Sequence, residues 1–133
     1  IVNNILKNKN LGFSSKNIYF LNMIFVNDKL MKKINKIYKK KNKPTDVLTF
    51  VNWIKNKNNQ PEAYCDIFFS ADTIKNDAKK NFLSFYDHIT HLIIHCFLHV
   101  NGYDHKNNTD FIKMKKLEEK ILEELNIKSP YLV

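Results

Sequence analysis

The segment HLIIHCFLHVNGYDH at residues 91–105 limits the folds open to this chain more than any other segment does. Apolar residues fill most of the stretch from residue 85 to residue 100, and Ser84 with Asp87 three residues later resembles a capping box in front of it. Gly102 then supplies a residue that readily takes the positive φ of a helix end. We therefore predict a strongly apolar helix over residues 85–100 that carries His95 and His99.

His95 and His99 lie four residues apart, so both imidazole rings leave the same side of this helix, one turn apart. Two nitrogens in that arrangement can bind one metal ion at the roughly 2.0–2.1 Å that zinc requires. The turn at Gly102 allows His105 to return toward the same ion. Three histidines with one open position are typical of a catalytic zinc site, whereas structural sites are usually closed by four protein ligands. The spacing thus predicts one zinc ion per chain on His95, His99 and His105, although nickel, cobalt or iron would suit the same ligands.

The residues around these histidines narrow the chemistry. The spacing His-x3-His-x5-His is that of metzincin proteases, which carry Glu directly after the first His as the general base, but here Cys96 stands there and argues against peptide hydrolysis. His91, one turn before His95, is expected to orient a ligand ring, with a role as fourth ligand left open. Asp104 suits a turn residue and a proton-transfer group equally well. His88 is expected at the surface. The alternative to a metal site is that these histidines only pack or form hydrogen bonds. Three histidines at this spacing favour the metal site.

The rest of the chain predicts strands mixed with helices. Three segments have the apolar, β-branched or aromatic composition of strands: residues 18–26, 47–51 and 63–69. The Asn-rich residues 52–62 are predicted as the longest loop. Helices are expected near the N-terminus, behind Asp28 as N-cap, from Ser70, and behind Thr109 as N-cap. These elements predict an α+β (mixed α/β) fold in a single small domain over residues 1–133, with a mixed sheet of three to four strands flanked by four to five helices.

The positive net charge of the chain does not by itself establish nucleic-acid binding. The formal net charge of +9 comes from 22 lysines and no arginine, and frequent Lys and Asn are typical of an AT-rich genome, so a solvated basic surface and nucleic-acid binding are equally supported. No apolar run reaches the roughly 18–20 residues that span a bilayer, and no membrane association is expected. The two cysteines, Cys65 and Cys96, suit a reducing compartment, so we expect a cytoplasmic protein, with a single disulfide left open. The first residue is not Met, and we expect N-terminal residues to be missing.

Three motifs in order along the chain resemble those of the YbeY family, bacterial zinc-dependent endoribonucleases that mature ribosomal RNA. HCFLHVNGYDH resembles the family signature HGxLHLxGYDH. NKPTDVLTF at residues 42–50 resembles DKPTDVLSF, and CDIFFS at residues 65–70 stands where the family has its GDI block. The closing SPYL is also similar to the end of the family's chains, so that the resemblance runs from about Ile18 to Leu132.

The resemblance implies roles for particular residues. His95, His99 and His105 match the metal ligands, and His91 matches a histidine often present one turn upstream. Residues 43–46, which include Lys43, Thr45 and Asp46, match a segment that lines the groove near the metal. This sequence departs from the family pattern at three positions. Lys39 stands where the family has a functional Arg, and Cys65 and Cys96 stand where it has glycines. The fold implied is a mixed sheet flanked by helices, with the metal at the mouth of a basic cleft.

The resulting expectation is a single-strand-specific, metal-dependent endoribonuclease that acts in ribosomal RNA maturation and ribosome quality control. Its partners would be RNA and the small ribosomal subunit, with no DNA expected. Zinc would activate the attacking water. The residues expected to act on the RNA are Lys39, Asp46 and Asp104 in catalysis and Lys41, Lys43 and Thr45 in substrate binding. An RNA-binding assembly factor with little turnover, a metzincin-like protease and a structural zinc domain are the alternatives.

Overall fold

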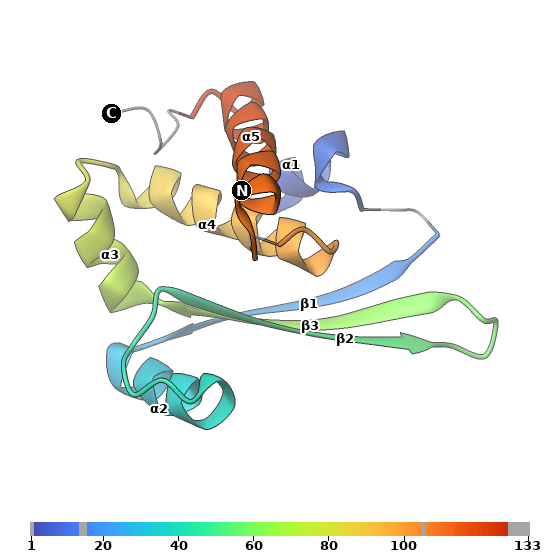
Figure 1. Cartoon of the computed structure of the whole chain (residues 1–133), viewed down its shortest axis with the longest axis horizontal. Helices are drawn as coiled ribbons and strands as arrows, with labels where there is room; N and C mark the ends of the chain where they lie inside the picture. The colour runs from blue at the N-terminus through green and yellow to red at the C-terminus, as the bar shows by residue number, and fades with distance from the viewer. Residues whose placement is uncertain (1, 14–15, 105, 128–133) are drawn as a thin grey trace. The chain divides into compact units, whose positions relative to one another are not determined.

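The computed structural model describes residues 2–13, 16–104 and 106–127 (Figure 1). The described residues form an α+β fold, as predicted, with a three-stranded mixed sheet and five α-helices. They fall into two compact units, one of residues 16–85 and one of residues 2–13, 86–104 and 106–127. None of the described helices combines the length and apolarity that crossing a membrane demands. The prediction of a single domain stays a prediction.

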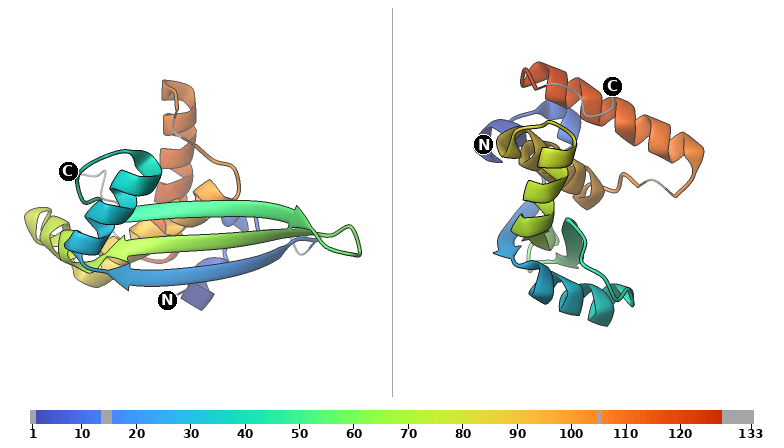
Figure 2. Two further views of the ribbon diagram at one scale, coloured as in Figure 1. Left: turned by 90° about the horizontal axis from the view of Figure 1, so that it is seen from below. Right: turned by 90° about the vertical axis from the view of Figure 1, so that its left-hand side faces the viewer.

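The sheet belongs to the unit of residues 16–85. Its strands lie in the order β1-β3-β2, with β1 parallel and β2 antiparallel to the central β3. Ile18 pairs with Glu62 at one end of the β1 ladder, and Val26 pairs with Ser70 at the other. Figure 2 shows the three strands side by side with α2 lying over one face. The elements of this unit are β1 (Ile18–Val26), α2 (Asp28–Lys39), β2 (Val47–Lys55), β3 (Pro61–Ser70) and α3 (Ala71–Lys80).

The prediction of a loop over residues 52–62 was wrong. β2 continues to Lys55 and β3 begins at Pro61, so that the two strands form a long hairpin. Asn56 closes the turn, because its side-chain oxygen accepts from the backbone N–H groups of Asn58 and Gln60, each at 2.9 Å. The polar composition misled because the ladder of backbone hydrogen bonds holds this exposed end of the hairpin, whatever its side chains are.

Two predicted N-caps lie one or two residues away from the real ones. Asn27 caps α2, with its side-chain oxygen 2.9 Å from the N–H of Leu30. The predicted cap Asp28 instead accepts hydrogen bonds from Ser70 and from Thr73, the latter at 2.6 Å. These bonds tie the start of α2 to the end of β3 and the start of α3.

The other unit is made of helices: α1 (Val2–Leu6), the short 3-10 helix η1 (Lys9–Leu11), α4 (Phe85–Val100) and α5 (Asn108–Glu124). Asn107 caps α5 in place of Thr109, with its side-chain oxygen 2.8 Å from the N–H of Asp110. The N-terminal segment lies on α4, since the ring of Phe13 meets that of Phe97 edge-on at 5.5 Å. Asn101 adds a hydrogen bond of 2.8 Å to the carbonyl of Leu11.

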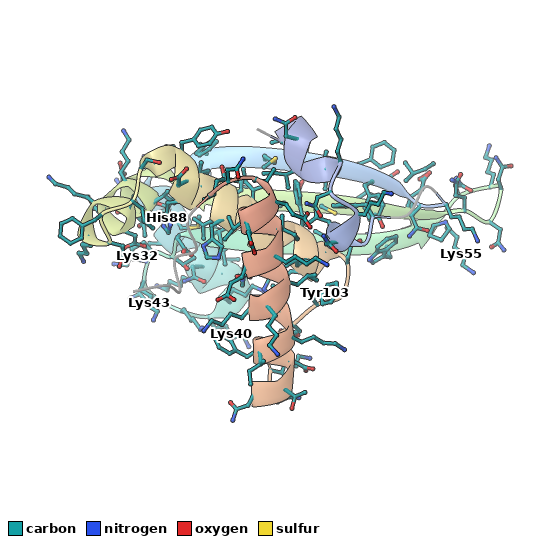
Figure 3. All side chains as sticks on the ribbon, turned by 90° about the horizontal axis from the view of Figure 1, so that it is seen from above. Lys32, Lys40, Lys43, Lys55, His88 and Tyr103 are labelled. Atoms are coloured by element: carbon teal, nitrogen blue, oxygen red, sulfur yellow. The ribbon has the colours of Figure 1, made fainter. Side chains whose placement is uncertain are left out.

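Helix α4 ends as predicted at Val100, and Gly102 in the turn that follows has φ 92°. The N–H of Gly102 donates to the carbonyl of His99 at 3.0 Å, and that of Tyr103 donates to Leu98 at 3.0 Å. This pair of bonds satisfies carbonyls that the helix end would otherwise leave unpaired. His88, labelled in Figure 3, is buried in α4, although it was predicted at the surface. Most residues of this helix are buried, on several of its sides.

Candidate metal centre

Helix α4 brings two of the three predicted ligands together. The Nε2 atoms of His95 and His99 lie 3.0 Å apart, and the rings meet at an interplanar angle of 83°. No group of three histidine, cysteine or carboxylate side chains is arranged around one point within the described residues. The predicted third ligand, His105, lies outside them. The structure therefore describes two of the three predicted ligands, which lie one turn apart on the same helix.

The partners of the two Nδ1 atoms determine which nitrogen of each ring carries hydrogen. Nδ1 of His99 lies 2.9 Å from the carbonyl oxygen of Tyr103, which can only accept. Nδ1 of His95 is hydrogen-bonded to the carboxylate of Glu118, which when ionised also only accepts. Both Nδ1 atoms are therefore donors, and in the neutral rings both Nε2 atoms keep a lone pair.

Two nitrogen lone pairs that face each other at 3.0 Å cannot hydrogen-bond while both rings are neutral. A cation that both nitrogens bind removes the repulsion between them, and neutral imidazole nitrogen is a common ligand of zinc. The residues present thus fit a metal ion on the Nε2 side of His95 and His99.

The sequence analysis missed Glu118, a carboxylate on α5 whose residue is only 1% exposed. It binds His95 through one oxygen and His91 through the other, with Nε2 of His91 at 3.0 Å. Burial raises the pKa of Glu118, but the hydrogen bonds from His91 and His95 lower it by more, to about 2 from 4.5. The carboxylate is consequently ionised at neutral pH. One signal could have found it, because Glu118 falls between Met114 and Ile121 on the apolar side of the last helix, where an isolated acidic residue needs a partner.

His91 and Asp104 have different surroundings. His91 lies one turn before His95, with ring centroids 6.5 Å apart, and contacts the same carboxylate. The side chain of Asp104 is 42% exposed, and its Oδ2 is 3.8 Å from the ammonium of Lys106. Asp104 therefore has access to solvent, while His91 is held by α5.

The other predicted site residues lie in the unit of residues 16–85, between the end of α2 and the start of β2. The ammonium of Lys39 lies 5.3 Å from the centre of the Phe50 ring. Oδ1 of Asp46 accepts from the N–H of Val47 at 2.8 Å and from the hydroxyl of Thr45 at 3.4 Å. One carboxylate oxygen of Asp46 is thus occupied by local hydrogen bonds that shape the start of β2.

A buried asparagine, also missed from the sequence, holds this loop. Asn35 is 3% exposed, and its side chain donates to the carbonyl of Lys43 at 2.8 Å. The backbone carbonyl of Asn35 accepts a hydrogen bond from the N–H of Lys41 at 3.3 Å. The backbone of the loop is therefore anchored to α2, while the side chains of Lys41 and Lys43 are exposed to solvent.

The matching family model and the relatives described below carry the same family name. Residues 1–126 match the family model described as Endoribonuclease YbeY. The chain is 39% identical over 112 residues to Endoribonuclease YbeY of Bartonella bacilliformis, covering 84% of this chain and 71% of that one. It is 35% identical over 130 residues to the protein of the same name from Ehrlichia canis, covering 92% and 80%. A solution structure of a Thermotoga maritima protein is similar over 94% of this chain and 79% of its own, with a TM-score of 0.54 and 25% identity.

Proposed function

The chain belongs to the YbeY family of endoribonucleases, and on that premise we propose that it is a zinc-dependent nuclease that cuts single-stranded segments during ribosomal RNA maturation and quality control. The observation that carries the zinc dependence is the pair of Nε2 atoms of His95 and His99, which face each other at 3.0 Å with both Nδ1 atoms engaged as donors. The protein would act in the cytoplasm on the small ribosomal subunit.

His95 and His99 would hold the zinc ion, with His105 as the third ligand. When bound, such an ion lowers the pKa of a water toward about 7 and stabilises charge on a phosphate oxygen. The protein's own contribution is to keep the two rings in one tautomer and one orientation. Glu118 does this for His95, and the carbonyl of Tyr103 does it for His99.

Lysines at the end of α2 would hold the RNA backbone. Lys41 and Lys43 are exposed, and the anchored loop backbone between them limits where their ammonium groups can reach. Lys39, which stands where the family has an arginine, offers a point charge in place of two parallel hydrogen bonds. Thr45 would contribute a hydroxyl to the same substrate contacts.

Two carboxylates are candidates for moving the proton in hydrolysis. Asp104 has an exposed side chain that a water can reach. Asp46 has one oxygen engaged by Val47 and Thr45, so that its other oxygen would have to act. Substituting each by asparagine and comparing the pH profiles of kcat separates the two.

The test combines metal content with cleavage of an RNA that has a structured core and single-stranded ends. Wild type and His99→Ala are compared as purified, after chelation and after zinc is added back. We expect one zinc per wild-type chain, cleavage that chelation abolishes and zinc restores, and none in the variant. His99→Gln, which keeps a polar side chain, replaces the alanine variant if its melting curve shows a loss of folding.

Two outcomes would overturn the proposal. Zinc-loaded wild type that binds the RNA but never cuts it would indicate an assembly factor. Zinc-loaded protein that cleaves casein and leaves RNA intact would indicate a protease.

A further inference from the structure

The lysines of this chain gather on α2 and the loop behind it. Eight of the 22 lysines fall within residues 29–43, and all eight side chains are exposed. Figure 3 labels three of these lysines, Lys32 on α2 and Lys40 and Lys43 just after it. Four lie on the helix ahead of the residues already assigned to substrate binding, and they are here called the α2 lysine surface: Lys29, Lys32, Lys33 and Lys36.

The spacing of these four lysines places them on one side of the helix. Lys29 is followed three and four residues later by Lys32 and Lys33, and Lys36 follows these by four and three, so at about 100° per residue all four fall within roughly a third of the helix circumference. The other side faces the sheet, because Met31 and Asn35 are buried and the ring of Tyr38 meets that of Phe50 at 5.2 Å. The α2 lysine surface therefore points away from the fold that α2 packs on.

No salt bridge within the described residues neutralises the α2 lysine surface. The single acidic residue of α2, Asp28, is already bound to the hydroxyls of Ser70 and Thr73. Like charges three and four residues apart on a helix destabilise it. The helix thus carries unbalanced positive charge at a cost to its own stability.

Codon bias does not explain this arrangement, because α5 of the same chain is balanced. Helix α5 has four lysines and five acidic residues, whereas α2 has five lysines and one acidic residue. A bias toward lysine acts on both helices alike, so the excess on α2 is local.

We propose that the α2 lysine surface binds the phosphate backbone of the RNA outside the nucleotides that react, and so sets affinity without contributing to the chemical step. This inference rests on the proposed function, since the family supplies RNA as the polyanion. Lysine ammonium groups gathered on one side of a helix complement a chain of phosphates, and such contacts recognise the backbone without reading the sequence. A membrane surface fits less well, because the helix side with Met31 is packed on the sheet and cannot enter lipid.

The experiment measures RNA binding separately from cleavage. The probe is a fluorescent structured RNA with single-stranded ends, and the chelated 133-residue chain is titrated against it at several salt concentrations. The variant changes Lys29, Lys32, Lys33 and Lys36 to glutamine, which has similar helix propensity. The matched control changes four other exposed lysines to glutamine and so removes the same net charge: Lys55, Lys57, Lys113 and Lys116.

We expect the slope of log K against log salt to become shallower by about 3 in the α2 variant, since each lost phosphate contact accounts for about 0.7–0.9. The RNA affinity of the α2 variant near 0.1 M salt should fall by about 10²–10³-fold. The fold-loss of affinity in the control variant should be at least ten times smaller. In cleavage assays of the zinc-loaded proteins, KM should rise in the α2 variant while kcat stays within twofold of wild type.

Equal losses in the two variants would overturn the inference, because only the net charge would then matter. It would also be overturned if the α2 variant bound the RNA as tightly as wild type does. In a parallel assay, wild type and the α2 variant are sedimented with phosphatidylserine vesicles, and a variant that no longer sediments but still binds RNA would indicate a membrane surface instead. The proposed function fails in a different way. If wild type never cleaves RNA but its RNA binding depends on the α2 lysine surface, the inference about this surface is supported and the proposed nuclease function is wrong.

Discussion

Changing Glu118 to glutamine tests how the proposed metal centre is held. The carboxylate is 1% exposed and accepts one hydrogen bond from His91 and one from His95. Glutamine has nearly the same shape but offers one oxygen and one NH2 group, so it can accept from only one of the two rings. The other ring must change its tautomer or lose its partner.

The expected magnitudes follow from that geometry. Loss of one hydrogen bond to a buried charged group costs about 1.5–3 kcal/mol in the free energy of unfolding. For a chain of 133 residues this lowers Tm by about 5–10 °C in the metal-free protein. Zinc affinity should fall about 10–100-fold, as is usual when a residue that orients a metal ligand is changed.

The assays are thermal melts of the metal-free chain, zinc competition against a chromophoric chelator, and NMR of the imidazole nitrogens. Glu119→Gln is the matched control, because it makes the same chemical change one residue along α5. If Glu118→Gln melts, binds zinc and shows ring tautomers as the control does, the reasoning that this carboxylate positions His95 is refuted.

The same carboxylate predicts a pH dependence. The pKa of Glu118 is about 2 in the folded protein and 4.5 ordinarily, so the unfolded chain binds more protons between these values. The stability that ionised Glu118 contributes is full above about pH 4.5 and is lost as the pH falls toward 2. Melts of wild type should therefore lose more Tm over this window than melts of Glu118→Gln.

Three further outcomes are expected. Phe82→Asn should raise stability by about 0.5–1 kcal/mol in chemical denaturation, because Phe82 is 96% exposed with φ 55°, a conformation that costs a bulky residue and suits Asn; a loss of stability would contradict this. Hydrogen bonds from Ser70 and Thr73 lower the pKa of Asp28 below its ordinary 3.8, so wild type should lose stability relative to Asp28→Asn as the pH falls from about 4 through the folded value, and parallel curves would refute it. Burial, and then Asp66, raises the pKa of Cys65 to about 11, so iodoacetamide at pH 8 should modify this thiol only after denaturant is added.

Local patterns in the sequence were enough to predict the helix that carries His95 and His99. Apolar content gave the span of α4, and a glycine after it gave the helix end, because both depend on neighbours in the chain. The i, i+4 spacing of His95 and His99 placed their rings together for the same reason. The end of the hairpin at residues 52–62 was not predicted, because its stability comes from pairing between strands and not from side-chain composition.

Contacts between distant parts of the chain could not be predicted in this way. Glu118 meets His95 across 23 residues, and nothing in the spacing of the histidines indicates which acidic residue of the last helix comes back to them. The N-cap of α2 shows the same limit. Asn27 and Asp28 are both good caps, and Asp28 is drawn away by Ser70 and Thr73, which lie more than 40 residues further along.

The two rings are held by groups of different chemistry. Apart from the chain neighbours of Gly102, no atom of the described residues lies within 4 Å of the position that a Cβ there would take, so glycine is needed for its φ of 92° and not for space. That conformation carries Tyr103 back to the helix end, where its carbonyl accepts from Nδ1 of His99. A backbone carbonyl does not ionise, so the hydrogen of His99 stays on Nδ1 at any pH at which the ring is neutral. His95 depends instead on a carboxylate, and therefore on the α5 contact that places Glu118 beside it.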